Sequence, residues 1–283
     1  MALNTYTDVS AFVNTVFEDA LFVARDNNLM IPLVTSFMDK RSMADRKNQE
    51  YGTAIMNEVA ETDDLVSQSF TPSALSTLTP KEYAGNFFLT DQRIDSDPFG
   101  ARNDASLELG LAAAQDIEIQ LVSNFSSFTA GTIGAAGTVM TWGHFYAMLS
   151  VLRNEKAPLP YAFVCHPFQW HELGKAATHA GGTATNAPNF QDEVVKTFWV
   201  RTVGPVDIFI SSNITIDGSD DAYSGMFSRA AIAYDSRRAP RLEPARNATR
   251  RGWDLVMSMI YGHGTWRPKY GVTGLFDCKT PTT

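Results

Sequence analysis

The sequence has few cysteines, no long apolar run and no signal-peptide pattern. Its two cysteines, Cys165 and Cys278, do not form a C-x-x-C pair, so neither a redox motif nor a cysteine-based metal site is indicated. No apolar run approaches the ~20 residues that a membrane-spanning helix needs. The N-terminus lacks the basic and apolar regions of a signal peptide. We therefore expect a protein that is made and assembled in the cytoplasm.

The sequence also lacks the motifs that usually carry catalysis. It contains no G-x-S-x-G elbow, no P-loop and no dinucleotide-binding fingerprint. His166 and His171 are five residues apart, a spacing that on a helix points them in different directions rather than onto one metal ion. His144, His179 and His263 have no cysteine or carboxylate at metal-ligand spacing. We expect structural or surface histidines, no catalytic residue, no metal and no cofactor.

The overall charge argues against a dedicated DNA-binding domain. The 283 residues carry a net charge of −8, with a pI near 5.1, whereas DNA-binding domains are usually strongly basic. Hydrophobic residues make up 44% and charged residues 19% of the chain, which is typical of an ordered globular protein. The low share of charged residues is expected if partners later cover part of the surface.

The first half of the chain contains segments that cannot bury their own apolar surface. Helical spacing of apolar residues predicts an amphipathic helix at residues 9–24, formed by Val9, Phe12, Val13, Val16, Phe17, Ala20, Leu21 and Ala24. The polar segment that follows is either an extended arm lying on another surface or a solvated linker. Residues 51–59 and 83–94 are strand-like, and the acidic segment between them contains Pro72 and Pro80, which disfavour a central strand. We expect a long two-stranded excursion that needs a neighbour, because an isolated hairpin is marginal in water.

A long helix and a mixed sheet are predicted for the rest of the chain. The helix would begin near Asp104 and reach about Phe125, a length of ~30 Å, with one stripe formed by Leu107, Leu111, Ala114, Leu121 and Val122. Further helices are expected at residues 141–153 and from His166-Pro167 onward, and residues 177–189 should form a mobile loop. Apolar runs predict strands at residues 161–165, 206–211, 226–234, 241–245, 255–261 and 271–276.

Six arginines fall within fifteen residues near the C-terminus, with Glu243 the only acidic residue between the first and the last: Arg237, Arg238, Arg241, Arg246, Arg250 and Arg251. A solvated basic face and a DNA-facing patch are two interpretations. We favour a third, because arginine pairs with carboxylates through two hydrogen bonds at interfaces. The acidic excursion supplies candidate partners in the same or a neighbouring subunit, namely Glu58, Glu61, Asp63 and Asp64. These ten residues form our hypothesis for intersubunit contacts.

Two runs of sequence resemble segments of tailed-bacteriophage major capsid proteins. Residues 76–94, STLTPKEYAGNFFLTDQRI, are similar to the segment in which a strand of the extended loop returns to the body before the long spine helix. Residues 225–235, GMFSRAAIAYD, followed by the arginine-rich strand and by the run from Trp253 to the motif WRPKYGV, resemble the C-terminal part of the same family. The resemblance covers nearly the whole chain and consists of patterns rather than invariant signatures.

The resemblance implies an α+β chain with the Hong Kong 97-type capsid fold. Its parts would be an N-arm at residues 1–48, an extended β-hairpin loop at 49–95, a peripheral domain with the spine helix at 96–130, an axial domain with a mixed sheet at 131–225, and strands at 226–283 that return through both domains. It further implies a virion subunit that self-assembles into pentamers and hexamers and encloses double-stranded DNA without sequence-specific binding or membrane contact. The implied partners are a portal, a separate scaffolding protein and, as a candidate, a decoration protein.

Two departures from the family pattern bear on this interpretation. Some members cross-link through a lysine in the extended loop, whereas residues 51–80 contain no lysine, so this chemistry is not expected at the loop tip. Some members carry a long cleaved scaffolding segment, whereas the arm here is short, so we expect a separate scaffold. Two alternatives remain open: an encapsulin-like shell protein of a cellular nanocompartment, and an α/β enzyme with a pocket in residues 131–225.

Overall fold

The computed structural model describes residues 29–39, 43–52, 54–59, 67–68, 70–96, 100–179 and 202–282. The described residues belong to two compact units. The smaller unit contains Glu82–Ile117 and Arg238–Ile260, and the larger contains Leu29–Lys81, Glu118–Arg237 and the residues after Tyr261. The predicted helix at residues 9–24 and most of the predicted loop at 177–189 lie outside the described residues.

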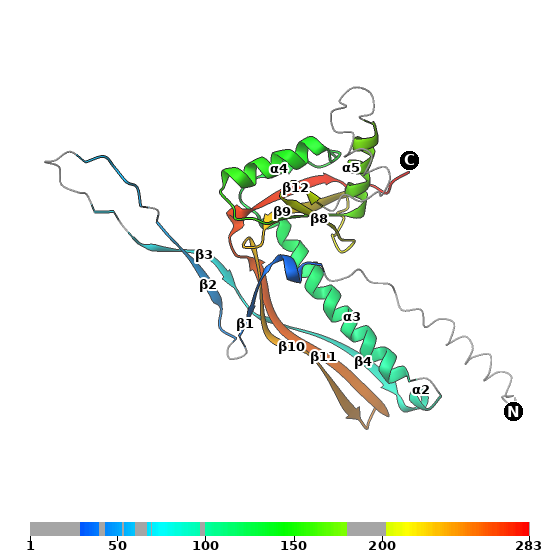
Figure 1. Cartoon of the computed structure of the whole chain (residues 1–283). Coiled ribbons are helices and arrows are strands. Elements are labelled where there is room, and N and C mark those ends of the chain that lie inside the picture. The colour runs from blue at the N-terminus through cyan, green and yellow to red at the C-terminus, as the bar shows by residue number, and fades with distance from the viewer. Residues whose placement is uncertain are drawn as a thin grey trace, which may run out of the picture. The chain divides into compact units, whose positions relative to one another are not determined.

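The larger unit contains a six-stranded mixed sheet (Figure 1). In spatial order its strands are β5 (Thr132–Gly134), β12 (Gly271–Asp277), β9 (Asp221–Ser228), β6 (Tyr161–Cys165), β8 (Val206–Ile210) and β7 (Thr202–Val203). β12 runs parallel to β5 and antiparallel to β9, and β6 runs antiparallel to β9 and parallel to β8. Every residue of β6 is buried, as expected for a strand covered on both faces. A mixed sheet is therefore confirmed, but the strands predicted at 241–245 and 255–261 belong to a second, four-stranded sheet.

Two helices accompany this sheet, and one of them covers it (Figure 1). They are α4 (Trp142–Asn154), which lies over the sheet, and α5 (Pro167–His179). Thr141 caps α4, because its Oγ1 accepts the His144 amide at 3.4 Å while His144 Nδ1 accepts the Thr141 amide at 3.3 Å. Of the four apolar side chains that the 141–153 pattern places inward, Phe145, Met148 and Leu152 are buried and Leu149 is half-buried. Both helices therefore follow the sequence prediction.

Long strands and the first part of the longest helix build the smaller unit. Its elements are β4 (Lys81–Thr90), α2 (Asp91–Ser96), α3 (Ala101–Val122) up to Ile117, and parts of β10 (Ile232–Asn247) and β11 (Gly252–Thr265). β11 lies between β10 and β4. The buried core consists of Leu89, Leu109 and Leu255, and Met257 packs against it. No helix in the described part of the chain is long and apolar enough to cross a membrane.

The strand pair of the extended loop lies earlier in the chain than the sequence predicted. Residues 54–59 contain no strand, and the actual pair is β2 (Arg46–Tyr51) with β3 (Pro72–Leu78). The prediction of a strand at 51–59 was wrong because β2 is a polar strand, with no apolar alternation to reveal it. Pro72 is tolerated because it is the first residue of β3, opposite the last residue of β2.

Five predicted elements have other bounds in the structure. The strand predicted at 83–94 ends at Thr90, whose Oγ1 accepts the Arg93 amide at 3.3 Å and so begins α2. The strand predicted at 226–234 is two strands, β9 and β10, separated by a turn in which the Ala231 amide donates to Ser228 O at 2.8 Å. α3 begins at Ala101, so Asp104 lies in the first turn instead of at the cap. The strands predicted at 241–245 and 255–261 are parts of the longer β10 and β11.

Three aromatic rings pack against one another beside β9 in the larger unit. Phe125 lies in η2 (Ser123–Ser127), and its ring centroid is 5.6 Å from that of Phe227 and 6.1 Å from that of Phe128. Gly225 lets β9 approach this cluster, because a Cβ at this position would lie 2.7 Å from Phe125 Cδ1. The rings can therefore pack closely only against a residue without a side chain.

Gly225→Ala should destabilise the protein by roughly 1–3 kcal/mol, the usual cost of overpacking a filled core. The added methyl group must displace the Phe125 ring, since Gly225 has an ordinary backbone conformation and only space is limiting. Gly218→Ala is the matched control, because a Cβ there meets no atom within 4 Å. Urea unfolding measures both, and equal midpoints for the two variants would contradict the packing argument.

Candidate assembly interface

The β2–β3 hairpin belongs to the larger unit and exposes most of its surface. Arg46 pairs with Leu78 at one end and Tyr51 with Pro72 at the other, with a register shift between Asn48 and Gln49. The side chains are exposed or half-buried along both strands until Leu78, which is fully buried. The hairpin is therefore held at one end and does not bury the rest of its own surface.

Large apolar side chains are exposed beyond the paired part of the hairpin. Tyr51 stacks on Phe70 with ring centroids 4.8 Å apart. The Gln68 amide continues the pairing, because Nε2 donates to Ile55 O at 2.5 Å and Oε1 accepts the Ile55 amide at 2.8 Å. Ile55 is 68%, Met56 95% and Phe70 73% exposed. Several exposed apolar side chains on one segment mark an interaction surface.

The root of the hairpin is fixed to the strand ends of the larger unit. Asn48 Nδ2 at 2.7 Å and Ser76 Oγ at 3.0 Å both donate to the backbone carbonyl of Trp266. The Trp266 ring meets the edge of Phe37, with centroids 5.1 Å apart. The Arg46 guanidinium lies over Phe37 at 4.6 Å from the ring centroid. Each hairpin strand is therefore attached to the same carbonyl.

A buried carboxylate completes this root. The side chain of Asp235 is fully buried and accepts a hydrogen bond from Arg46 Nε at 2.9 Å and from Arg237 Nη2 at 2.8 Å. Arg237 is 8% exposed, donates to Ala44 O at 3.2 Å and lies 3.3 Å from Asp39. A buried charge is tolerable only when it is paired and hydrogen-bonded. Asp235 therefore connects β10 to the residues that enter the hairpin.

Three of the predicted arginines pair with carboxylates of the smaller unit. Arg238 Nη2 is 2.5 Å from Glu82 Oε1 and 3.0 Å from Ser258 Oγ. Arg246 holds Asp91 through two bonds of 2.5 and 2.8 Å, and this hydrogen bonding raises the pKa of Arg246. The third pair joins two neighbours on β10, Arg241 and Glu243.

The other two predicted arginines, Arg250 and Arg251, are exposed in the turn between β10 and β11. The Arg250 guanidinium lies 4.7 Å from the centroid of Phe88. Arg251 has a φ of 50° and its carbonyl accepts the Asp91 amide at 3.0 Å. Within the described ranges, neither guanidinium has a carboxylate partner.

Glu58 is exposed, while Glu61, Asp63 and Asp64 lie outside the described residues. The six predicted arginines therefore do not form one patch within the chain, since four of them pair with other carboxylates and two form a turn. The i, i+2 spacing of Asp235 with Arg237 could have been read from the sequence as one face of a strand. No sequence pattern identifies Glu82 or Asp91 as partners of the arginines, because both carboxylates are distant from them in the chain.

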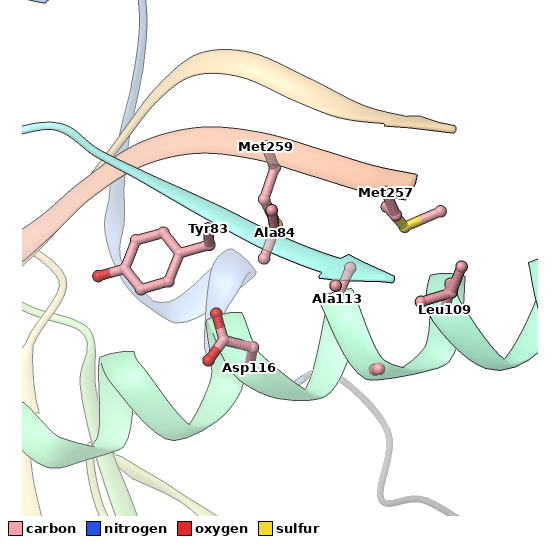
Figure 2. A pocket seen from close by; sticks show the side chains of 9 residues that line it. Tyr83, Ala84, Leu109, Ala113, Asp116, Met257 and Met259 are labelled. Atoms are coloured by element: carbon pink, nitrogen blue, oxygen red, sulfur yellow. The ribbon is translucent and has the colours of Figure 1, made fainter. Parts of the chain in front are cut away.

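A cavity of about 260 Å³ lies in the smaller unit between α3, β4 and β11 (Figure 2). Small and apolar side chains line it, with Tyr83 and Asp116 as the polar exceptions. Asp116 is the one carboxylate among them, so the lining contains no pair of carboxylates for acid–base chemistry. This is not the position expected for the pocket of an enzyme, which the sequence placed in residues 131–225.

The residues with the most reactive side-chain types are buried in neutral forms. Cys278 Sγ is 3.0 Å from His166 Nδ1, and both residues are buried. Burial, reinforced by Asp277, raises the pKa of the Cys278 thiol to about 12, and burial lowers the pKa of His166. Burial also raises the pKa of Cys165. At neutral pH this contact is therefore not the thiolate–imidazolium pair of a cysteine nucleophile.

The remaining described histidine side chains contact polar neighbours. His144 completes the cap of α4, His171 Nδ1 lies 3.5 Å from Glu172 Oε1, and His263 Nδ1 lies 3.2 Å from Asn124 Nδ2. The described residues contain no group of three potential metal ligands. Among the described residues, the hairpin segment exposes Ile55, Met56 and Phe70, and the β10–β11 turn exposes Arg250 and Arg251.

A family profile matches most of the chain. The profile of the family described as Phage capsid protein covers residues 74–274. This range runs from β3 to β12 and includes both units. A search of curated protein sequences finds no match.

Solved structures of phage capsids are similar over nearly the whole chain. The capsid of cyanophage P-SCSP1u superposes with a TM-score of 0.69 at 14% identity, covering 92% of this chain and 91% of that one. Mycobacterium phage Che8 gives a TM-score of 0.71 at 14% identity, covering 90% and 93%. The head of Helicobacter pylori bacteriophage KHP40 gives 0.68 at 10% identity, covering 92% and 94%. At these identities the likeness establishes a shared fold.

Asp235→Asn should lower the free energy of unfolding by roughly 3–5 kcal/mol, the usual cost of removing one member of a buried ion pair. The substitution leaves Arg46 and Arg237 without their shared charge. Glu50→Gln is the matched control, because Glu50 and Lys269 are exposed and 3.9 Å apart, a pair worth at most about 1 kcal/mol. Chemical unfolding followed by tryptophan fluorescence compares them, and a small effect at Asp235 would count against its role at the root.

Proposed function

The chain belongs to the phage capsid protein family and is a major capsid protein that assembles with copies of itself into a shell, and from this premise we propose how its surfaces are used. Its fold is the Hong Kong 97-type capsid fold. We propose that the copies form pentamers and hexamers of an icosahedral head, assembled in the host cytoplasm, that encloses double-stranded DNA. A portal, a separate scaffolding protein and a decoration protein are the proposed further partners.

The observation that carries this proposal is the exposure of the hairpin. Ile55, Met56 and Phe70 are each more than two-thirds exposed, and they lie beyond the paired part of the hairpin. Burying a side chain of this size stabilises a contact by about 1.5–3 kcal/mol. Because the hairpin cannot fold back on itself to bury them, a neighbouring subunit is the natural partner for these side chains.

We propose one structural role for each successive part of the chain. Residues 1–48 act as an N-arm, residues 49–95 as the extended loop, residues 96–130 as the peripheral domain, residues 131–225 as the axial domain, and residues 226–283 return through both domains. The β2–β3 hairpin supports the extended loop, although its first strand begins at Arg46. α3 supports the spine helix, and the strands between β5 and β9 support the axial domain.

We propose that the intersubunit arginine contacts involve mainly Arg250 and Arg251. Arg237, Arg238, Arg241 and Arg246 are paired with carboxylates of their own chain, so they act by shaping the strands. Arg250 and Arg251 are exposed in their turn, and their charges remain available for a second subunit. Their proposed partners are the acidic side chains of a neighbour's loop: Glu58, Glu61, Asp63 and Asp64.

Phe70→Asp and Met56→Asp should prevent shell formation, or raise the protein concentration that it needs by at least about tenfold, which corresponds to 1.4 kcal/mol per contact. Both side chains are largely exposed in the subunit, so the unfolding midpoint should not change. Met56→Leu is the control that keeps an apolar side chain. Sedimentation and negative-stain microscopy give the result, and shells formed by both aspartate variants at the normal concentration would rule out a buried role for the loop.

A charge reversal tests the arginine contacts separately. Arg250→Glu with Arg251→Glu should weaken assembly several-fold, most clearly at low salt, where exposed charges are least screened. Arg153→Glu, an exposed arginine at the end of α4, is the control for a change in net charge. Adding Glu58→Arg should restore part of the assembly if the pairing is direct. Assembly that is unaffected by the double reversal, followed by light scattering, would remove these arginines from the interface.

A nanocompartment shell, the alternative function, differs from a phage head in the contents of the particle. A phage head should hold double-stranded DNA after assembly in infected cells, whereas a compartment shell should hold protein cargo. Nuclease treatment followed by DNA extraction from purified particles separates the two. The family match supports the phage assignment.

A further inference from the structure

Hydrogen bonds within its own residues order the turn between β10 and β11. Asn247 Oδ1 accepts the Arg250 amide at 3.2 Å and the Thr249 hydroxyl at 2.9 Å. The Arg251 amide donates to Ala248 O at 3.4 Å. Arg251 has a φ of 50°, a left-handed conformation that residues other than glycine rarely adopt. Because such a conformation persists only where its surroundings fix it, the turn depends on further contacts.

Asp91 supplies these contacts through both its backbone and its side chain. It is the first residue of α2, and its amide donates to Arg251 O at 3.0 Å. Its carboxylate accepts two hydrogen bonds from Arg246, at 2.5 and 2.8 Å. Arg246 Nη1 also donates to Gly252 O at 3.2 Å, on the other side of the turn. Asp91 and Arg246 therefore connect the start of α2 to both strands that flank the turn.

Two aromatic rings hold the arginines of this region against the sheet. The Arg250 guanidinium lies 4.7 Å from the centroid of Phe88, and the Arg246 guanidinium lies 5.7 Å from that of Trp253. Gly252 lets β11 approach the end of β4, because a Cβ at this position would lie 2.6 Å from Phe88 Cζ. A turn that moved away from β4 would therefore lose the Phe88 contact and change the direction of Arg250.

We propose that Asp91 and Arg246 form a clamp that positions Arg250 and Arg251 for contact with a neighbouring subunit, a role that rests on the intersubunit contacts proposed above for these two arginines. An arginine and a carboxylate joined by two hydrogen bonds have a fixed mutual orientation. The clamp therefore holds the turn in one arrangement before assembly. A surface that is ordered in advance loses less conformational entropy when it binds, so the clamp favours assembly through the turn.

Trypsin cleavage of the unassembled full-length subunit measures the clamp independently of assembly. Asp91→Asn keeps the size of the side chain but removes its charge and one of its two acceptor oxygens. Cleavage after Arg250 or Arg251, identified by mass spectrometry, should be at least about tenfold faster in this variant, because proteolysis follows the population of the open turn. Arg246→Lys keeps the charge but loses the two-bond geometry, so its cleavage rate should be intermediate.

Glu82→Gln is the matched control for the loss of an exposed ion pair. Glu82 pairs with Arg238 in the first half of β10, away from the turn, so cleavage at the turn should keep the wild-type rate. Urea unfolding should give Glu82→Gln and Asp91→Asn the same midpoint. Cleavage unchanged in Asp91→Asn, or equally fast in Glu82→Gln, would overturn the clamp. A midpoint lowered only in Asp91→Asn would also overturn it, because cleavage would then follow loss of the fold.

Assembly of combined variants tests whether the clamp acts through the turn. Asp91→Asn should raise the protein concentration needed for shell formation several-fold. It should add nothing in a chain that already carries Arg250→Glu and Arg251→Glu, because residues that act through one another are not additive.

Two assembly results would overturn the positioning role of the clamp. One is normal assembly of Asp91→Asn while the double reversal at Arg250 and Arg251 weakens assembly. The other is a further loss of the same size when Asp91→Asn is added to that reversal. A reversal without effect would instead reject the intersubunit contacts of the two arginines, and the clamp would then have no role in assembly even where cleavage detects it.

Discussion

The buried carboxylate of Asp235 is the constraint on which the exposed hairpin depends. It is shared by Arg46, at the start of β2, and by Arg237, two residues further along β10. A strand pair that is exposed on both faces has little apolar burial of its own, so its position must be fixed at its root. One charge, two guanidinium groups and the Trp266 carbonyl provide that attachment. The reach of the hairpin toward a neighbouring subunit follows from this root.

The two units distribute their stability differently. The larger unit has a buried core between its sheet and helices, and beside β9 Gly225 and the rings of Phe125 and Phe227 are closely packed. The smaller unit has three buried leucines and a cavity of about 260 Å³ under α3.

The arginine cluster shows how much of a site can be read from a sequence. Spacing identified six charges close together in the chain but not their partners, because strand residues at even and odd positions point to opposite faces. Arg238 meets Glu82 and Arg246 meets Asp91, over 155 residues or more. Propensity and periodicity describe neighbours in the chain, whereas these pairs depend on which strands lie side by side. Arg250 and Arg251 became the best candidates for contact with another subunit only after the other four were assigned.

The sequence by itself determined the buried strand at Tyr161–Cys165 and the helix that follows Thr141, because each has a strong local pattern. It also determined that the long helix α3 exists, but not its buried face: Leu107 of the predicted stripe is 51% exposed, whereas Leu109 and Ile117 are buried. It also determined that the loop region cannot bury its own surface. Only the tertiary structure decided that Arg46–Tyr51 pairs with Pro72–Leu78. A polar strand lacks the alternation of apolar residues by which a strand is predicted. Its position depends on residues distant in the chain, Asp235 and Trp266, which bind its first residues. The sequence was sufficient to predict the elements that are stabilised by a local hydrophobic pattern. The hairpin is stabilised by a buried charge and a shared carbonyl, and these contacts are known only from the tertiary structure.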